Sequence, residues 1–388
     1  MSDPSVARCW RPYGTSIFTE MTALAKAHGA VNLSQGFPDF APPDRLLDLA
    51  NHHMRQGGAG NQYAPMAGLA SLRQAIAGKV AAYYGRTVNP ESEVTVTSGG
   101  TEALFCVIQA IVRAGDEVIL LDPAYDSYEP AVELAGGRAV HVPLQRPGFG
   151  IDWQRLRDAI SPRTRLLIVN FPHNPSGATL DAADLAQLAE LLRGTGAFVL
   201  ADEVYEHMLF DGRRHHSLST HAELAARSFV VSSFGKTYHA TGWKVGYCIA
   251  PSSLTQEFQK VHQFVQFVVA TPLQAAIADF MRECPEHTLQ LPAFYQGKRD
   301  YFAGLLARTR FKFEPAHSTY FQLVDYSALS DLPDTEFARL LTLQHGVAAI
   351  PISVFSADPA AKNERIVRFC FAKHEATLDA AAAKLRLL

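Results

Sequence analysis

Residues 228–251 read SFVVSSFGKTYHATGWKVGYCIAP, and they place Lys236 in a loop between two short apolar runs of β type. Ser233, Gly235 and a second cation, Lys244, surround this lysine, and such groups suit an anion held beside an amine, such as a cofactor phosphate. A lysine desolvated next to cations has its ammonium form disfavoured and can attack an aldehyde. The stretch alone is equally compatible with two surface lysines that flank a hairpin.

The composition indicates a large soluble protein with a small-molecule partner. The chain has 388 residues, of which 48% are hydrophobic and 19% charged, so it can bury more than one domain of usual size. With 35 basic and 38 acidic residues the net charge is −3, which gives no broad basic field for nucleic acid or an anionic membrane. Residues 1–30 lack a secretory signal and no apolar run is long enough to span a bilayer, so we expect a cytoplasmic protein.

Cysteines and histidines give no metal pattern. The five cysteines are an odd number without paired spacing, and we interpret them as reduced, mostly buried thiols. The pairs His52-His53 and His215-His216 have the wrong spacing for two ligands on one helix face, and we expect them on the surface. The sequence therefore predicts no metal site.

From Glu93 to Asp211, short apolar runs alternate with helical patterns, which favours a mostly parallel sheet covered by helices on both faces. After Pro251 we expect helices near 254–281 and 292–307, followed by short strands and helices of a smaller α+β unit. Loops gather at the carboxyl ends of parallel strands, where ligands bind. The candidate motifs fall at such ends, at 98–102, 122–125, 172–176, 202–205 and 233–236.

Three of these motifs have a physical reading of their own. Ser98-Gly-Gly-Thr-Glu102 opens a helix, so its N–H groups and the Thr101 hydroxyl could cradle a phosphate, although such glycine turns also occur without ligands. Asp202 ends an apolar strand and needs a cation or a donor, such as a protonated ring nitrogen; a helix N-cap is the alternative. Arg368 lies in an apolar strand, where its planar fork would match a carboxylate or an internal salt bridge.

Five segments carry a family resemblance over nearly the whole chain. They are Asn32–Phe40 (NLSQGFPDF), Asn174–Gly177 (NPSG), Asp202–Tyr205 (DEVY), Ser232–His239 (SSFGKTYH) and Arg368–Lys373 (RFCFAK). The chain resembles the fold-type I pyridoxal-phosphate aminotransferases, in the class I branch with the kynurenine, glutamine-phenylpyruvate and bacterial methionine aminotransferases, and it is most similar to the last of these. The resemblance implies an α/β large domain with a mostly parallel sheet and a smaller α+β domain. The expected division is an N-terminal arm over 1–40 that packs on the small domain, a large domain over 41–284 and a small domain over 285–388.

The resemblance also implies roles for single residues. Lys236 would carry the cofactor, pyridoxal 5′-phosphate, and transfer the proton at the substrate Cα. The phosphate would be bound by Gly100, Thr101, Ser233 and Lys244, and by Tyr63 from a neighbouring subunit. Asp202 would hold the ring nitrogen, Asn174 and Tyr205 the phenolic oxygen, and Tyr125 the ring face, although an aromatic in a loop is more often simple packing. Arg368, with Asn174 and the Gly36 backbone beside it, would hold the substrate α-carboxylate.

We therefore expect a homodimeric aminotransferase with shared active sites that acts on methionine and other large neutral or aromatic L-amino acids. Candidate walls of the side-chain pocket, by resemblance and position, are Tyr13, Phe18, Tyr63 and Phe355. Dicarboxylate-specific relatives carry a second arginine, for which Arg8 and Arg11 are possible counterparts. Kynurenine transamination or cysteine-conjugate β-lyase activity on the same site is the alternative, and a ligand-sensing regulator would need a DNA-binding segment that residues 1–30 do not supply.

Overall fold

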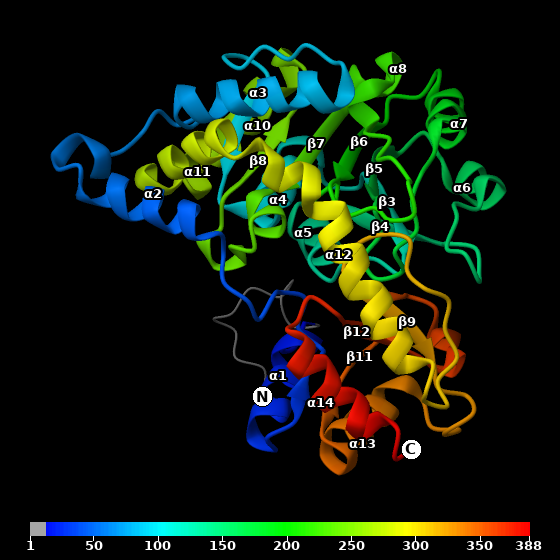
Figure 1. Cartoon of the computed structure of the whole chain (residues 1–388). Helices are drawn as coiled ribbons and strands as arrows, with labels where there is room; N and C mark the ends of the chain where they lie inside the picture. Colours follow the sequence, from blue (N-terminus) through cyan, green and yellow to red (C-terminus); the bar gives the residue numbers. More distant parts are fainter. Residues whose placement is uncertain (1–12) are drawn as a thin grey trace, which may run out of the picture.

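The computed structural model describes residues 13–388, apart from the side chain of Ala59 (Figure 1). Arg8, Cys9 and Arg11 lie outside the described residues. The larger sheet of the protein has the strand order β2-β8-β7-β6-β5-β3-β4. All neighbours are parallel except β8, which pairs antiparallel with both β2 and β7. The strands are β2 (Val94–Thr97), β3 (Glu117–Asp122), β4 (Arg138–Pro143), β5 (Thr164–Asn170), β6 (Phe198–Asp202), β7 (Ser228–Ser233) and β8 (Gly246–Ile249).

Helices cover both faces of this sheet, which explains why its central strands are apolar at successive positions. In β3, Ile119 and Leu121 face one core and Val118 and Leu120 face the other. The second of these cores is closed by α4 (Gly99–Ile111), α5 (Tyr128–Leu134) and α10 (Ser252–Val265). The first is closed by α6 (Trp153–Ala159), α7 (Ala182–Leu192) and α8 (Ala222–Ala225). At the β2 and β8 end, the apolar cover comes from α2 (Asp44–Arg55), α3 (Ala70–Tyr84) and α11 (Thr271–Glu283).

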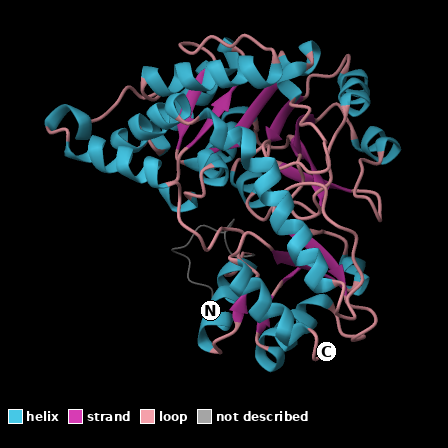
Figure 2. Cartoon of the chain, viewed as in Figure 1, coloured by secondary structure: helices cyan, strands magenta, loops and turns pink. Residues whose placement is uncertain are grey.

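The long helix α12 (Pro285–Leu306) connects this layer to a second, smaller one, drawn below it in Figures 1 and 2. The smaller layer holds an antiparallel sheet in the order β11-β12-β9. Its parts are β9 (Phe321–Asp325), α13 (Asp334–His345), β10 (Val347–Ala348), β11 (Ile350–Pro351), β12 (Ile366–Cys370) and α14 (Glu375–Leu385). The N-terminal helix α1 (Ile17–Ala27) lies against it, and β1 (Val31–Asn32) pairs with β10. Helix α1 and the C-terminal helix α14 thus share one core.

Short helical turns complete the chain: η2 (Gly58–Asn61), η3 (Leu218–Thr220), α9 (Phe234–Thr237), η4 (Thr241–Trp243), η5 (Ser353–Phe355) and η6 (Pro359–Glu364). The expected single helix over 254–281 is instead α10 and α11. Phe267 between them has φ +66°, and Pro272 opens α11, so the chain cannot continue as one helix there. Conversely, α12 begins at Pro285 and contains Pro292, at which we expected it to start. His215 is also not a surface residue, because its ring is buried against Glu203.

Within residues 13–388, no helix combines the length and the apolar character needed to cross a membrane. Cys106, Cys248 and Cys370 are buried free thiols and Cys284 is half-buried.

Candidate active site

A cavity of about 510 Å³ lies where the strand ends of the larger sheet meet the N-terminal segment and the small sheet. Its wall combines strand-end loops with residues more than a hundred positions away, so the fold and not the local sequence assembles it. Twelve of the predicted site residues line it, namely Phe18, Gly36, Gly100, Thr101, Tyr125, Asn174, Asp202, Tyr205, Ser233, Lys236, Lys244 and Arg368.

Lys236 lies on the one-turn helix α9 between β7 and β8. Its Nζ atom donates hydrogen bonds to the Tyr320 hydroxyl at 3.0 Å and to the Gly36 carbonyl at 3.2 Å. Burial lowers the pKa of its amine to about 8, with Arg368 and Lys244 contributing in the same direction against Cys370 and Asp202. A larger share of the amine is therefore neutral near pH 7 than for an exposed lysine, as a nucleophile requires.

Asp202 ends β6 with its carboxylate buried. Tyr128 donates a hydrogen bond to its Oδ2 at 2.6 Å, and the Val204 N–H donates to Oδ1 at 3.4 Å. Burial raises the pKa of Asp202 to about 6, and these two hydrogen bonds only partly offset it. A buried carboxylate with few donors is suited to receive a further cationic or N–H partner.

This geometry gives a stability prediction for the cofactor-free protein. Asp202 has a folded pKa above its unfolded value, so the folded state binds more protons between about pH 4 and pH 6. Stability falls as the pH rises through that window, and the full cost, up to about 3 kcal/mol, is present near pH 7. Asp202→Asn should therefore raise the melting temperature of the cofactor-free protein at about pH 7.5 and much less at about pH 4.5. Calorimetry at both pH values checks this, and an equal gain at the two would contradict it.

The first turn of α4 and Lys244 form one cationic corner of the cavity. Gly99 has φ +70°, and a Cβ there would lie 3.3 Å from the Lys244 Nζ, so only glycine leaves this approach open. The positive end of the 13-residue helix α4 points to the same place. With Thr101 and Ser233 also on the wall, the corner offers a cation, hydroxyls and N–H groups to a phosphate.

Arg368 is fully buried and has no carboxylate within ion-pair distance among the described residues. Its guanidinium donates to Asn174 Oδ1 at 2.7 Å and to the Ser34 carbonyl at 3.1 Å, while its Nε atom has no partner. The ring of Phe321 lies 3.9 Å from it. A buried guanidinium held by neutral groups leaves its charge available to an anionic ligand.

Two aromatic residues shape the rest of the cavity. The Tyr125 ring lies 6.4 Å from that of Phe18, and burial raises the pKa of its hydroxyl to about 12. Tyr205 is buried, with its ring 5.6 Å from the Lys236 Nζ, and burial keeps its hydroxyl neutral by raising the pKa well above the usual value. Both phenols therefore remain available as hydrogen-bond donors.

Three predicted wall residues do not line the cavity. Tyr63 is 81% exposed and packs edge-on against Phe267. Phe355 is buried behind Phe18, at 5.6 Å between ring centroids. Tyr13 interacts with Glu133 on α5. Burial, and then the nearby Glu133 carboxylate, raise the pKa of the Tyr13 hydroxyl.

Sequence reasoning missed several residues at the site. Tyr320 contacts Lys236, Tyr128 contacts Asp202, and Asn170 donates to the Asp202 carbonyl at 2.9 Å. Tyr128 follows the predicted Tyr125 by three positions at a helix start, a spacing that could have suggested it. No local signal marks Tyr320.

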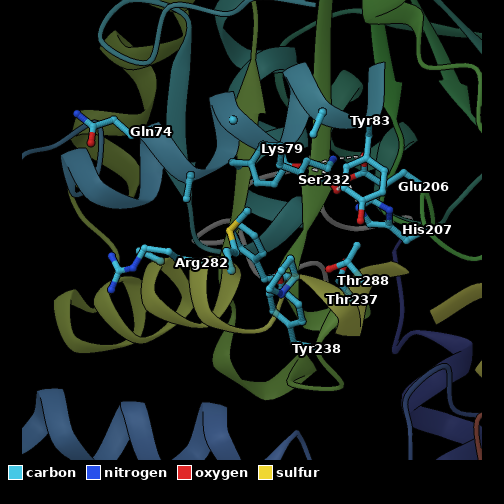
Figure 3. A pocket seen from close by; sticks show the side chains of 18 of the residues that line it. Gln74, Lys79, Tyr83, Glu206, His207, Ser232, Thr237, Tyr238, Arg282 and Thr288 are labelled. Carbon is cyan, nitrogen blue, oxygen red and sulfur yellow. Dashed lines mark hydrogen bonds and ion pairs between the residues drawn. The ribbon is translucent and has the colours of Figure 1, made fainter. Parts of the chain in front are cut away.

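A second cavity, of about 470 Å³, is lined by Thr237 and Tyr238, which directly follow Lys236 in the chain (Figure 3). In it the buried Glu206 accepts hydrogen bonds from Lys79, Ser232, Tyr84 and Tyr247. Burial alone would raise the pKa of Glu206, but the ammonium of Lys79 and these donors hold it below its usual range. Glu206 directly follows Tyr205, and Ser232 directly precedes Ser233. The hydrogen bonds of Glu206 therefore restrain the backbone next to both of these site residues.

One group of potential metal ligands occurs in the described part of the chain, namely Glu102, Cys106 and His262, whose ligand atoms lie within 4.8 Å of one another. His262 Nδ1 is 2.9 Å from Glu102 Oε1, and its Nε2 is 3.1 Å from the Met66 carbonyl. These contacts tie α10 to α4 and to the loop before α3.

Comparison with known proteins identifies the family. The family model for aminotransferase class I and II matches residues 28–385. The chain belongs to this family. It is 53% identical to methionine aminotransferase from Escherichia coli (strain K12), over 97% of this chain and 96% of that protein. It is 35% identical to human kynurenine–oxoglutarate transaminase 1, over 95% of this chain and 94% of that protein.

Solved structures agree with these relatives. A crystal structure from Escherichia coli, described as having a methionine aminotransferase function, superposes with a TM-score of 0.95 at 52% identity, covering 99% of this chain and 100% of that one. Aspartate aminotransferase from Thermus thermophilus with maleate gives a TM-score of 0.89 at 31% identity, covering 99% and 100%. The α/β architecture with a mostly parallel sheet, as expected, is that of fold-type I aminotransferases.

The protein is thus a pyridoxal-phosphate-dependent transaminase. The donor set of the cavity fits this cofactor. It offers an anion-binding corner at Lys244, a buried carboxylate at Asp202 and an amine of lowered pKa at Lys236, all in the lining of one cavity.

Proposed function

We propose that this aminotransferase transfers the amino group of methionine and of other large neutral or aromatic L-amino acids to a 2-oxo acid. The observation that carries the proposal is a cavity with one buried guanidinium, Arg368, and aromatic side chains from Phe18, Tyr125 and Phe321. Arg368 is the only arginine that lines it among residues 13–388. Such a wall stabilises a thioether or a ring through burial, whereas a second carboxylate would lose its hydration without a partner. The methionine aminotransferase name of the 53% identical relative agrees with it.

The family resemblance assigns the roles of the residues, all of which line the cavity. Gly100, Thr101, Ser233 and Lys244 would hold the cofactor phosphate, and Asp202 the ring nitrogen. Asn174 and Tyr205 would bind the phenolic oxygen, and Tyr125 would lie against the ring. When bound, the cofactor supplies an aldehyde and an electron-withdrawing ring that makes the substrate Cα proton acidic.

The substrate and the proton would be handled by this chain's own groups. Arg368, with Asn174 and the Gly36 backbone beside it, would bind the α-carboxylate and so orient the Cα–H bond. Lys236 would hold the cofactor between turnovers. With its amine free, it would take the proton from the substrate Cα and return it on the cofactor side. The pKa of about 8 places this amine near the pH at which both transfers can proceed.

Substrate selectivity tests the proposal. Each buried methylene contributes about 0.8 kcal/mol to binding. The kcat/KM for methionine should therefore exceed that for alanine by more than about tenfold. Steady-state assays of a panel of amino acids with one common 2-oxo acid would show this order. Aspartate reacting as well as methionine or phenylalanine would contradict the pocket assignment, while kynurenine as the best donor would favour the alternative suggested by the kynurenine–oxoglutarate relative.

We also propose that the enzyme is a cytoplasmic homodimer with shared active sites. Tyr63 and Phe264 are 81% and 85% exposed, and Val265 and Phe267 are also exposed, which is unusual for apolar side chains that are close in space. A second copy of the chain would cover them and bring Tyr63 to the neighbouring cofactor phosphate. Within each copy, residues 41–284 and 285–388 would act as large and small domains, with the arm of residues 1–40 on the small one.

A further inference from the structure

Tyr320 joins Lys236 to the segment that would hold the substrate carboxylate. Its hydroxyl donates to the Gly36 carbonyl at 2.5 Å and lies 3.0 Å from the Lys236 Nζ atom. A phenol has one proton, and Tyr320 uses it in the hydrogen bond to the Gly36 carbonyl. Toward the lysine amine, the phenol oxygen therefore acts as a hydrogen-bond acceptor. Lys236 Nζ is also 3.2 Å from the same Gly36 carbonyl, and the three polar groups form a closed triangle.

The position of this hydroxyl is fixed by packing. Tyr320 has 0% exposure, and its ring contacts those of Tyr205 at 5.3 Å, Tyr295 at 5.7 Å and Phe321 at 4.9 Å. Burial raises the pKa of Tyr320 well above its usual value, so the phenol stays neutral. A rigid, neutral acceptor therefore faces the amine at every working pH.

We propose that Tyr320 is a positioning residue that holds the amine of Lys236 while it is not bound to the cofactor. The inference rests on the proposed role of Lys236 and extends it. During half of each catalytic cycle the amine must be free, yet close enough to move the Cα proton, and a flexible four-carbon side chain would otherwise sample many rotamers. The hydrogen bond to Tyr320 selects one of them, beside Gly36 and the substrate carboxylate.

The same contact affects the protonation of the amine. A hydrogen bond from the amine to the phenol oxygen favours the ammonium form of Lys236. It therefore offsets part of the lowering of the lysine pKa by burial. The other groups that face the amine are Tyr205, Asp202, Lys244, Arg368 and Cys370. A Tyr320→Phe variant removes one hydroxyl and keeps the ring. It also removes the hydrogen bond between the Tyr320 and Tyr205 hydroxyls, and it leaves Asp202, Lys244, Arg368 and Cys370 in place.

The first test uses the cofactor-free protein, so that it does not depend on turnover. The rate at which trinitrobenzenesulfonate modifies Lys236, followed by peptide mapping across pH, reports the midpoint of amine titration. Tyr320→Phe should shift that midpoint down by about one pH unit. Tyr326→Phe is the matched control, because Tyr326 is equally buried in the same layer and donates to the Leu332 carbonyl, away from the lysine.

The second test uses the loaded enzyme. Tyr320→Phe should lower kcat by about tenfold with little change in KM, and raise the isotope effect of Cα-deuterated methionine, because proton transfer becomes slower. An unchanged midpoint and an unchanged isotope effect would overturn the proposal. If Tyr320→Phe melts well below the wild type, 3-fluorotyrosine at this position weakens the acceptor without removing it, and a shift in the same direction is expected. Finding the cofactor attached elsewhere than Lys236 would instead reject the proposed role of Lys236 on which this inference rests.

Discussion

Lys236→Ala is expected to lower kcat for methionine by at least about 10⁴-fold, because the variant loses the amine that we propose both holds the cofactor and moves the Cα proton. The amine lies in the cavity with Asp202 and Arg368, and burial has already lowered its pKa to about 8. No neighbouring lysine can replace it without a change of backbone, since Lys244 occupies the anion-binding corner. Single-turnover measurements with loaded enzyme give the size of the loss.

Chemical trapping shows whether the loss has this cause. Wild-type enzyme should be yellow, and borohydride reduction followed by peptide mapping should place the cofactor on Lys236. Lys260→Ala is the control, because Lys260 is exposed and pairs only with Glu257; it should leave kcat unchanged. An adduct on Lys244, or residual activity within about tenfold of wild type, would reject the assignment.

The inactive variant also tests whether subunits share sites. Mixing Lys236→Ala subunits with Tyr63→Phe subunits should restore part of the activity, provided that each variant alone is severely impaired. In a mixed dimer, one of the two sites then carries both the lysine of one copy and the tyrosine of the other. No recovery in verified mixed dimers would count against a shared site.

Arg368→Met is expected to reduce kcat/KM for methionine by about 10³-fold, because a bidentate, desolvated contact with a carboxylate is worth several kcal/mol. The guanidinium is fully buried, has an unpartnered Nε and, among residues 13–388, hydrogen-bonds to the neutral groups of Asn174 and Ser34. Arg368→Lys should recover little, since an ammonium cannot reproduce the planar fork. Steady-state kinetics with all three proteins measure the effect.

A ligand without the carboxylate separates this role from a structural one. 3-(Methylthio)propylamine has the methionine side chain and amine but no carboxylate, so its inhibition constant should be nearly the same for wild type and Arg368→Met. Arg299→Met is the matched control, because Arg299 is also a buried arginine but pairs with Asp211 and Asp300 outside the cavity. It should lower the melting temperature without changing kcat/KM. Equal weakening of methionine and of the amine would show that Arg368→Met damages the fold.

The sequence, with the family resemblance that it carries, predicted the architecture and proposed the residues at the centre of the site. Short apolar runs such as residues 117–121 and 198–201 predict strands buried on both faces, since only a sheet covered twice needs apolar side chains at successive positions. Polar residues directly after such runs, such as Asp202, lie at strand ends and are brought together by the parallel arrangement itself. Lys236 was proposed from its loop between two apolar runs together with the family resemblance, and Arg368 because a charge in an apolar strand requires a partner.

Only the tertiary structure decided which groups those residues meet. Tyr320 is 84 positions from Lys236, and Tyr128 is 74 from Asp202, so no periodicity connects them. It also decided that Phe355 lies behind Phe18 and that Tyr63 is exposed and does not line the cavity of its own chain. Apolar periodicity records how deeply a side chain is buried, because burial depends on the face of its own element. Partner identity depends on strand order and on the path of the loops, and these are set by packing across the whole fold.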